Sequence, residues 1–181
     1  METFIETERL ILREMLPTDM DEMFELESDP EVHKYIGNNP KTNKQQVIEI
    51  IDNIRQQYKD NGIGRWIVID KKSHELIGWS GLKFITELTN NHKNYYDLGY
   101  RLKKKFWGQG FATETAFAFL GYAFEKLNAP KVYAMANVEN DGSNKVLKKA
   151  GLKFIETFDF DGTEHNWYKI EKAEFENRLC N

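Results

Sequence analysis

Two kinds of apolar spacing alternate along the chain and predict helices and strands. Apolar residues recur every three or four positions between Val47 and Tyr58 and between Ala116 and Leu127, as on a helix with one buried face. Elsewhere, short runs of apolar and aromatic residues bounded by turn signals indicate strands. The strands are expected at residues 3–14, 66–70, 76–85, 95–102, 132–137, 152–160 and 167–170, the last two as an antiparallel pair around Asp161-Gly162.

Capping residues set the expected ends of the helices. The expected N-terminal signals are Thr18 as the N-cap after Pro17, Asp29 before Pro30, and Thr42 in a capping box with Gln45. The expected stops are Gly37, Gly62 with Gly64, the segment 128–130, and Gly151 after a helix at 140–150. The resulting order, β-α-α-α-β-β-β-α-β-α-β-β, predicts a mixed α/β (or α+β) domain.

Length and composition indicate one globular domain over residues 1–181. A chain of 181 residues can bury a core without cross-links, and no linker or repeat divides it. The net charge of −4 argues against a direct nucleic-acid binder. The single cysteine, Cys180, excludes a disulfide within the chain and favours a reducing compartment. The first residues do not read as a signal peptide, and no window approaches about 18 apolar residues, so a cytoplasmic protein outside the membrane is expected.

A glycine-rich turn lies between the predicted strand 95–102 and the helix that follows it. Gly108 and Gly110 would allow several backbone N–H groups to point at one anion at the start of the helix, as in a phosphate-binding loop. The lysines at 103–105 are expected to add positive charge, and Phe106 and Trp107 are expected to pack in the core. A plain strand-to-helix connection would also account for the two glycines. Neither the Rossmann spacing nor a Walker Gly-Lys-Ser/Thr sequence is present.

Residues 105–112 resemble the acetyl-CoA pyrophosphate loop of the GNAT superfamily, whose pattern is Gln/Arg-x-x-Gly-x-Gly/Ala; Lys105 stands at the Gln/Arg position. Residues 7–13, 28–32 and 140–151 resemble the RimJ/RimL-like branch, the ribosomal-protein-alanine N-acetyltransferases, which also includes small-amine acetyltransferases. The resemblance implies the GNAT acyl-CoA N-acyltransferase fold, with a central, mostly antiparallel sheet flanked by helices. The sheet would be splayed between strands 95–102 and 132–137, and acetyl-CoA would lie in the gap.

The resemblance also implies which residues bind the cofactor. The expected set is Leu102, Lys103, Lys105, Gly108, Gln109, Gly110, Phe111, Ala112, Thr113, Asn140 and Ser143. Asn140 would contact the pantetheine arm or order the loop, although N-capping of the helix at 140–150 explains it equally well.

Direct transfer to an amine requires a route for the amine proton, a donor to the carbonyl oxygen and an acid for the leaving thiolate. By resemblance Ser143 is the acid, although a capping role fits it as well. Asp97 is the candidate base, acting directly or through water. The alternative is that Asp97 is simply a solvent-exposed carboxylate at the edge of a strand. The oxyanion donor is expected to be a backbone N–H within residues 101–103. No acyl-cysteine intermediate at Cys180 is expected.

The expected acceptor is a primary amine, either a protein N-terminus or a small amine such as a polyamine or an antibiotic-like compound. By resemblance His33 and Tyr35 border its pocket, and Trp79 and Trp167 either line that pocket or belong to the core. The histidines show no metal-ligand spacing, so no metal is expected. The rival hypotheses are a non-catalytic acyl-CoA-binding module and a nucleotide-dependent redox enzyme. Monomer and homodimer are both open.

Overall fold

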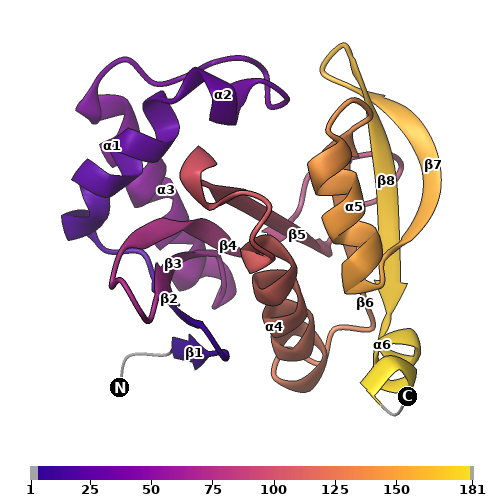
Figure 1. The fold of residues 1–181 in the computed structure, drawn as a ribbon. Coiled ribbons are helices and arrows are strands. Elements are labelled where there is room, and N and C mark those ends of the chain that lie inside the picture. The colour runs from indigo at the N-terminus through magenta and orange to yellow at the C-terminus, as the bar shows by residue number, and fades with distance from the viewer. Residues whose placement is uncertain (1–3, 180–181) are drawn as a thin grey trace.

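An eight-stranded sheet in the order β1-β2-β3-β4-β5-β6-β8-β7 forms the centre of the computed structural model, which describes residues 4–179 (Figure 1). Neighbouring strands are antiparallel except for the parallel pair β5 and β6. The sheet is therefore mostly antiparallel, as predicted. Its strands are β1 (Phe4–Glu6), β2 (Leu10–Glu14), β3 (Arg65–Asp70), β4 (Leu76–Ile85), β5 (Tyr95–Leu102), β6 (Lys131–Asn137), β7 (Lys153–Phe160) and β8 (Thr163–Glu171).

Helices cover both faces of this sheet. They are η1 (Pro17–Asp19), α1 (Met20–Ser28), α2 (Pro30–His33), α3 (Lys44–Asn61), η2 (Lys104–Phe106), α4 (Phe111–Glu125), α5 (Asp141–Ala150) and α6 (Lys172–Leu179). Successive residues of β3 alternate between the two sides: Trp66 and Val68 pack in the core beneath α4, while Ile67 packs with α1 and α3. Figure 1 shows α4 and α5 side by side on one face of the sheet.

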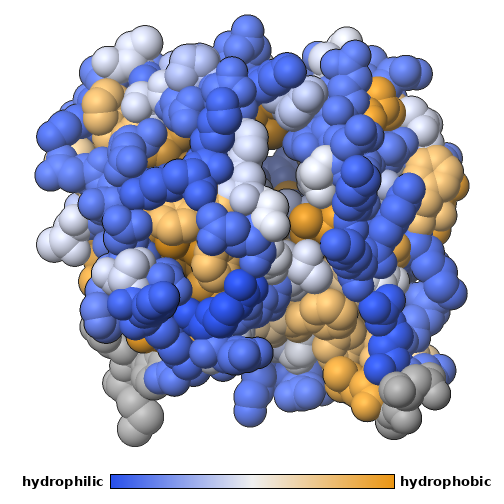
Figure 2. All heavy atoms as spheres, viewed as in Figure 1, coloured by the Kyte–Doolittle hydropathy of each residue, from blue (hydrophilic) through white to orange (hydrophobic). Residues whose placement is uncertain are grey.

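The sheet opens between β5 and β6. Their only paired residues are Tyr96 with Val132 and Asp97 with Tyr133, whereas β4 and β5 remain paired as far as Gly78 and Leu102. Beyond Asp97, the edge of β5 that faces away from β4 is therefore no longer paired with β6. Figure 2 shows the molecular surface hollowed between the part that carries α2 and the part that carries α5. The predicted splay between these two strands is confirmed.

Several predicted boundaries are confirmed and others are wrong. Gly62 (φ 68°) and Gly151 (φ 101°) end α3 and α5 in the left-handed conformation that favours glycine. The single strand predicted at 3–14 is instead the hairpin of β1 and β2, whose turn is closed by a hydrogen bond from the Thr7 N–H to the Leu10 carbonyl (3.0 Å).

The predicted caps at Thr18 and Thr42 are also wrong. Asp19 is the N-cap of α1, but its carboxylate is turned back to the Leu16 N–H and does not cap the helix. The N-cap of α3 is Asn43, whose side chain accepts from the Gln46 N–H, so the capping pattern is shifted by one residue. Ser, Thr, Asn and Asp are all able to cap, and adjacent candidates compete.

Helix α6 was not predicted from the apolar spacing. It is anchored by Phe175, whose ring centroid lies 5.2 Å from that of Phe124 on α4. One buried residue in eight gives no helical period in the sequence. Within residues 4–179 no helix is both long and apolar enough to cross a membrane. Cys180 lies outside the described residues.

Candidate active site

The glycine turn between η2 and α4 is open to solvent. Residues 107–110 are exposed, and Gly108 (φ 74°) and Gly110 (φ 83°) both have left-handed backbones. Gly110 is the N-cap of α4 and has no side chain with which to cap it. The first N–H groups of α4, at residues 111–113, have no carbonyl partner within the helix, because the i→i−4 acceptors would lie before its start. The turn therefore presents unused N–H donors at the positive end of a helix, an arrangement suited to an anion.

Arg9, on the segment that enters β2, holds this turn in place. Its Nη1 donates to the Gln109 carbonyl (2.9 Å), and its guanidinium lies 4.4 Å from the centroid of the Phe111 ring. The guanidinium also pairs with Glu114 (2.7 Å), which accepts a further hydrogen bond from the Thr7 hydroxyl (2.6 Å). Burial raises the pKa of Glu114, but hydrogen bonds from Thr7 and Arg9 outweigh it and hold that pKa below its usual value. Arg9 was not predicted as a site residue.

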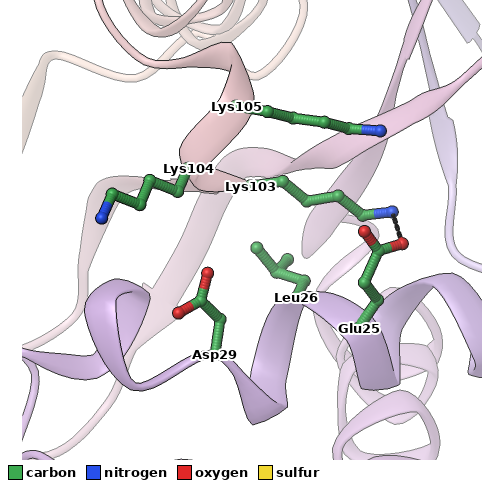
Figure 3. Close-up of a pocket in the computed structure, with 6 residues that line it drawn as sticks. All are labelled: Glu25, Leu26, Asp29, Lys103, Lys104 and Lys105. Atoms are coloured by element: carbon green, nitrogen blue, oxygen red, sulfur yellow. Dashed lines mark hydrogen bonds and ion pairs between the residues drawn. The ribbon is translucent and has the colours of Figure 1, made fainter.

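The three lysines before the turn do not supply the free positive charge that was expected. Each forms an ion pair with a glutamate: Lys103 with Glu22 and Glu25 (2.5 Å each), Lys104 with Glu31 (3.2 Å) and Lys105 with Glu75 (3.2 Å). Figure 3 shows the three lysines around a cavity of about 400 Å³ beside α1, with Lys103 directed at Glu25. The glutamates come from segments distant in sequence, so the lysine run alone does not reveal the pairing.

The two aromatic residues before the turn have different roles. Phe106 is half-buried and its ring packs against Phe111 at 6.2 Å between centroids, as predicted. Trp107 is not a core residue, because 45% of it is exposed. Its indole Nε1 donates to the Leu102 carbonyl (2.7 Å), and the Gln109 side chain donates to the Lys105 carbonyl (2.9 Å). These two bonds tie the turn back to the end of β5.

Ser143 lies across the gap from β5. It is in the first turn of α5, where its N–H donates to the Asn140 side chain (3.1 Å), so the capping role of Asn140 is confirmed. The Ser143 hydroxyl oxygen is 3.0 Å from the Tyr100 hydroxyl oxygen, which also donates to the Ser143 carbonyl (3.1 Å). Burial raises the pKa of Tyr100, so this phenol keeps its proton at neutral pH. Tyr100 was not predicted as a site residue, since its contact with Ser143 depends on the splay.

Buried Asn144 fixes the start of α5. Its side-chain nitrogen donates to the Asn137 and Asn140 carbonyls, and its side-chain oxygen accepts from the hydroxyl of Tyr168 on β8 (2.7 Å) and from Asn166 (2.9 Å). These four partners account for both N–H groups and both oxygen lone pairs of this amide. The helix that carries Ser143 is therefore anchored to both β6 and β8.

Two backbone N–H groups of β5 face the gap. The Lys103 N–H donates to the Ile77 carbonyl (2.9 Å), with Leu102 opposite Gly78. The alternation of an antiparallel ladder then directs the N–H groups of residues 101 and 103 to β4, and those of Tyr100 and Leu102 to the edge that β6 has left. Within the predicted range 101–103, only Leu102 is placed to donate into the gap.

A second cluster lies on the opposite face of β5, centred on Glu27 of α1. This carboxylate is 0% exposed and accepts from Trp79 Nε1 (3.1 Å), from His33 Nε2 (3.1 Å) and from Arg101 Nη1. Burial, followed by the nearby Arg101 charge, lowers the pKa of His33, which favours the neutral ring. Glu27 and Arg101 were not predicted as a pair because 74 residues separate them.

The Glu27 cluster forms one wall of a cavity of about 330 Å³. Its lining residues are Glu27, His33, Ile36, Asn39, Lys41, Ile50, Ile54, Trp79 and Arg101. Of the predicted acceptor contacts, His33 and Trp79 are therefore brought together. Tyr35 does not line this cavity; its ring lies beneath the Lys34 ammonium at 5.1 Å. Trp167 is fully buried and stacks on Tyr133, so it belongs to the core.

Asp97 is not beside Ser143. It forms an ion pair with Arg65, which also donates to the Asp97 carbonyl (2.7 Å), and it lies on the face of β5 opposite Tyr100. Burial raises the pKa of Asp97, and the adjacent Arg65 charge opposes that effect only in part. Asp97 shares its face with Arg101, four residues along the strand, and it does not line the 330 Å³ cavity. Across residues 4–179, no three His, Cys, Asp or Glu side chains are grouped to hold a metal ion.

Comparison with known proteins agrees with this geometry. Residues 9–153 match the family described as an acetyltransferase (GNAT) domain. An uncharacterized N-acetyltransferase, p20 of Bacillus licheniformis, is 35% identical over 153 residues, which span 84% of this chain and 83% of the relative.

Two solved structures share the fold. The ribosomal-protein-S5-alanine acetyltransferase of Vibrio fischeri superposes with a TM-score of 0.77 at 16% identity, covering 96% of this chain and 99% of the other. The spermidine N-acetyltransferase of Vibrio cholerae, in complex with CoA and spermine, gives a TM-score of 0.75 at 21% identity, with coverage of 94% and 100%.

Proposed function

This chain belongs to the GNAT acetyltransferase family and is an acetyl-CoA-dependent N-acetyltransferase, and on that premise we propose that it moves the acetyl group directly to a primary amine. The observation that carries this proposal is a convergence at one gap: the glycine turn, the free edge of β5 and the Ser143 hydroxyl all meet there. A RimJ/RimL-like assignment and a cytoplasmic location are part of the proposal.

The residues around the gap fit the cofactor. The N–H groups of residues 108–113 would hold the diphosphate, because the turn at 107–110 is exposed and the first N–H groups of α4 are unused by the helix and lie at its positive end. A side chain at Gly108 would meet nothing within 4 Å, so this part of the turn is open to a ligand. Arg9 holds the turn through its hydrogen bond to the Gln109 carbonyl. The lysines at 103–105 add little net charge, because each is paired with glutamate. When bound, acetyl-CoA supplies an activated acetyl thioester.

Leu102 and Ser143 would act on opposite sides of the reacting carbonyl. The Leu102 N–H, and behind it that of Tyr100, would donate to the carbonyl oxygen as negative charge develops there. The Ser143 hydroxyl would give its proton to the leaving sulfur, and the Tyr100 hydroxyl, 3.0 Å from Ser143 Oγ, would hold that hydroxyl in place and keep its own proton. Asn140 and Asn144 would hold the serine in place through α5.

Asp97 is our candidate for the base that takes the amine proton. Asp97 lies four residues along the strand from Arg101, which lines the candidate acceptor cavity. At 3.3 Å per residue this is roughly 13 Å, so the proton would travel through water. The raised pKa of this carboxyl makes it a better proton acceptor near neutral pH than an ordinary aspartate. An Asp97→Asn variant should lose the acidic limb of the pH–rate profile, and an unchanged profile would remove Asp97 from this role.

Two classes of acceptor fit the family: the N-terminus of a protein, as in ribosomal-protein acetyltransferases, and a small amine. Neither solved structure decides between them, because at 16% and 21% identity each is a likeness of fold. The size of the Glu27 cavity, about 330 Å³, is at the lower end for small-molecule sites and favours a small amine.

The decisive experiment measures thiol release from acetyl-CoA by the purified protein with a panel of amines and N-terminal peptides. We expect release that depends on the amine, and binding of CoA without binding of NAD. CoA binding with no amine-dependent release would instead support a non-catalytic acyl-CoA-binding module.

A further inference from the structure

The cavity beside Arg101 is lined by a single carboxylate, and the protein's own side chains take up most of it. Glu27 is completely buried and its two oxygens accept from Trp79, His33 and Arg101. Three of its roughly four acceptor positions are therefore taken, and the Arg101 guanidinium already balances its charge, which leaves little attraction for the ammonium group of a ligand. The nearest further carboxylate on this face of β5, Asp97, is likewise occupied by Arg65.

The cations of this cavity outnumber its anions. Arg101 balances Glu27, and Lys41 remains. Within residues 4–179, no carboxylate lies within ion-pair distance of the Lys41 ammonium, which is nevertheless close enough to His33 to lower the pKa of that ring. The Lys41 N–H donates to the Glu27 carbonyl (2.7 Å), which fixes this lysine at the cavity. The lining therefore carries one net positive charge.

Unused hydrogen-bond donors accompany this charge. Arg101 has five N–H donors and spends one of them on Glu27, and 21% of its side chain is exposed. The buried His33 adds no donor, because its Nε2–H is used on Glu27 and the Nδ1 of the neutral ring, which has no hydrogen-bond partner among the described residues, is an acceptor. Three isoleucines, Ile36, Ile50 and Ile54, form an apolar part of the wall, which also contains Asn39 and Trp79.

We propose, on the basis of the function above, that the acceptor is a small primary amine that also bears a carboxylate, as a free amino acid does. Lys41 and the free N–H groups of Arg101 bind the carboxylate, and the isoleucine wall receives an apolar side chain. Arg and Lys are the usual partners of a bound carboxylate. A polyamine would bring two or more further positive charges to a cavity that has no free anion, and the backbone of a peptide N-terminus has no carboxylate at this position.

The positive lining also assists the chemistry. A nearby positive charge disfavours the ammonium form of the acceptor and lowers the pKa of its amine. A larger fraction of the bound acceptor is then the neutral nucleophile.

Leucine and leucinamide provide a matched pair of probes, since they share size and side chain and differ in the carboxylate and, through it, in the basicity of the amine. With saturating acetyl-CoA we expect kcat/KM for leucine to exceed that for leucinamide by about tenfold or more, the size of one charge-assisted hydrogen bond. At neutral pH the less basic amine of leucinamide has the larger neutral fraction, so a preference for leucine would run against the supply of free amine. Spermidine and an uncharged N-terminal tetrapeptide should both be poorer than leucine.

Two variants at Lys41 and one control locate the effect. Lys41→Met should raise KM for leucine about tenfold, leave KM for acetyl-CoA unchanged and bring the two probes level. Lys41→Glu should reverse the order and favour spermidine. Lys44→Met is the control, because Lys44 is exposed, pairs with Asp21 (2.6 Å) and does not line the cavity. It should keep the preference for leucine.

Wild-type protein that uses leucinamide, spermidine or the tetrapeptide as well as leucine would overturn this inference and leave the acetyltransferase proposal standing. Absence of release with every amine would count against the proposed transfer instead. Calorimetric binding of N-acetyl-leucine and N-acetyl-leucinamide in the presence of CoA then tests the cavity alone. About tenfold tighter binding of the carboxylate, lost in Lys41→Met, is the expected result, and equal binding would overturn the inference.

Discussion

The hydroxyl oxygens of Tyr100 and Ser143 lie 3.0 Å apart and join β5 to α5 across the open part of the sheet. The splay leaves this stretch of β5 without a neighbouring strand, so a side-chain contact replaces the backbone ladder there. The same opening leaves the Leu102 N–H without a strand partner, and in our proposal the cofactor extends into it from the glycine turn. A structural feature that weakens the sheet thus brings together the groups to which we assign acetyl transfer.

Removal of the Ser143 hydroxyl should slow turnover while binding of the cofactor is nearly kept. For Ser143→Ala we expect kcat to fall roughly 10²-fold, the lower range for loss of a general acid, since the Ser143 N–H still completes the cap with Asn140. Steady-state kinetics and calorimetry with CoA measure the two quantities. Tyr100→Phe should cause a smaller fall, and Tyr122→Phe on α4 is the control. Unchanged turnover in Ser143→Ala would exclude the acid role.

Gly108 and Gly162 form a matched pair for testing the phosphate turn. Their φ angles are 74° and 79°, and a side chain at either would meet nothing within 4 Å. Alanine should therefore cost a similar amount of folding free energy at each site, about 1 kcal/mol. Only Gly108→Ala should also weaken CoA binding, because Gly162 lies in the β7–β8 hairpin. Equal CoA dissociation constants for the two variants would contradict the assignment of the turn.

Gly78 is required for the close approach of β4 to β5 at the edge of the site. A Cβ at this position would lie 2.7 Å from the Leu102 Cα and closer still to the Arg101 carbonyl, and neither backbone atom can yield easily. We expect Gly78→Ala to lower the free energy of unfolding by about 3 kcal/mol or more. Thermal unfolding measures this. Gly142→Ala is the control, since its nearest contact would be at 3.6 Å; two variants of equal stability would refute the argument.

The buried ring of His33 should make the protein sensitive to acid. Its pKa is lowered below the model-compound value of 6.5, so between that lowered pKa and 6.5 the unfolded chain binds more protons than the folded one. The free energy of unfolding should therefore rise with pH up to about 6.5 and lose this contribution as the pH falls. Denaturant titrations from pH 5 to pH 8 measure the slope.

A His33→Gln variant should show a smaller rise over the same interval. His74→Asn is the matched control, because His74 is exposed and asparagine tolerates its left-handed backbone (φ 61°). If His33→Gln kept the full slope of the wild type, other groups would have to be responsible for it.

Sequence alone identified the features that depend on a few neighbouring residues. The apolar periods of α3 and α4, the glycines that end α3 and α5, and the exposed glycine turn all follow from local backbone preferences and side-chain spacing. The cap of α3 was wrong by one residue because Thr42 and Asn43 are both competent caps. Helix α6 was not predicted, because a single buried phenylalanine gives no helical spacing of apolar residues.

The pairing of distant charges and hydroxyls was decided only by the tertiary structure. A run of three lysines has the same sequence whether it faces a phosphate or four glutamates, and the fold brings the glutamates to it from α1, α2 and the turn before β4. Glu27 and Arg101 are 74 residues apart, and Tyr100 and Ser143 are 43 apart. Such contacts depend on strand order and register, which place residues in space without leaving a local pattern in the chain.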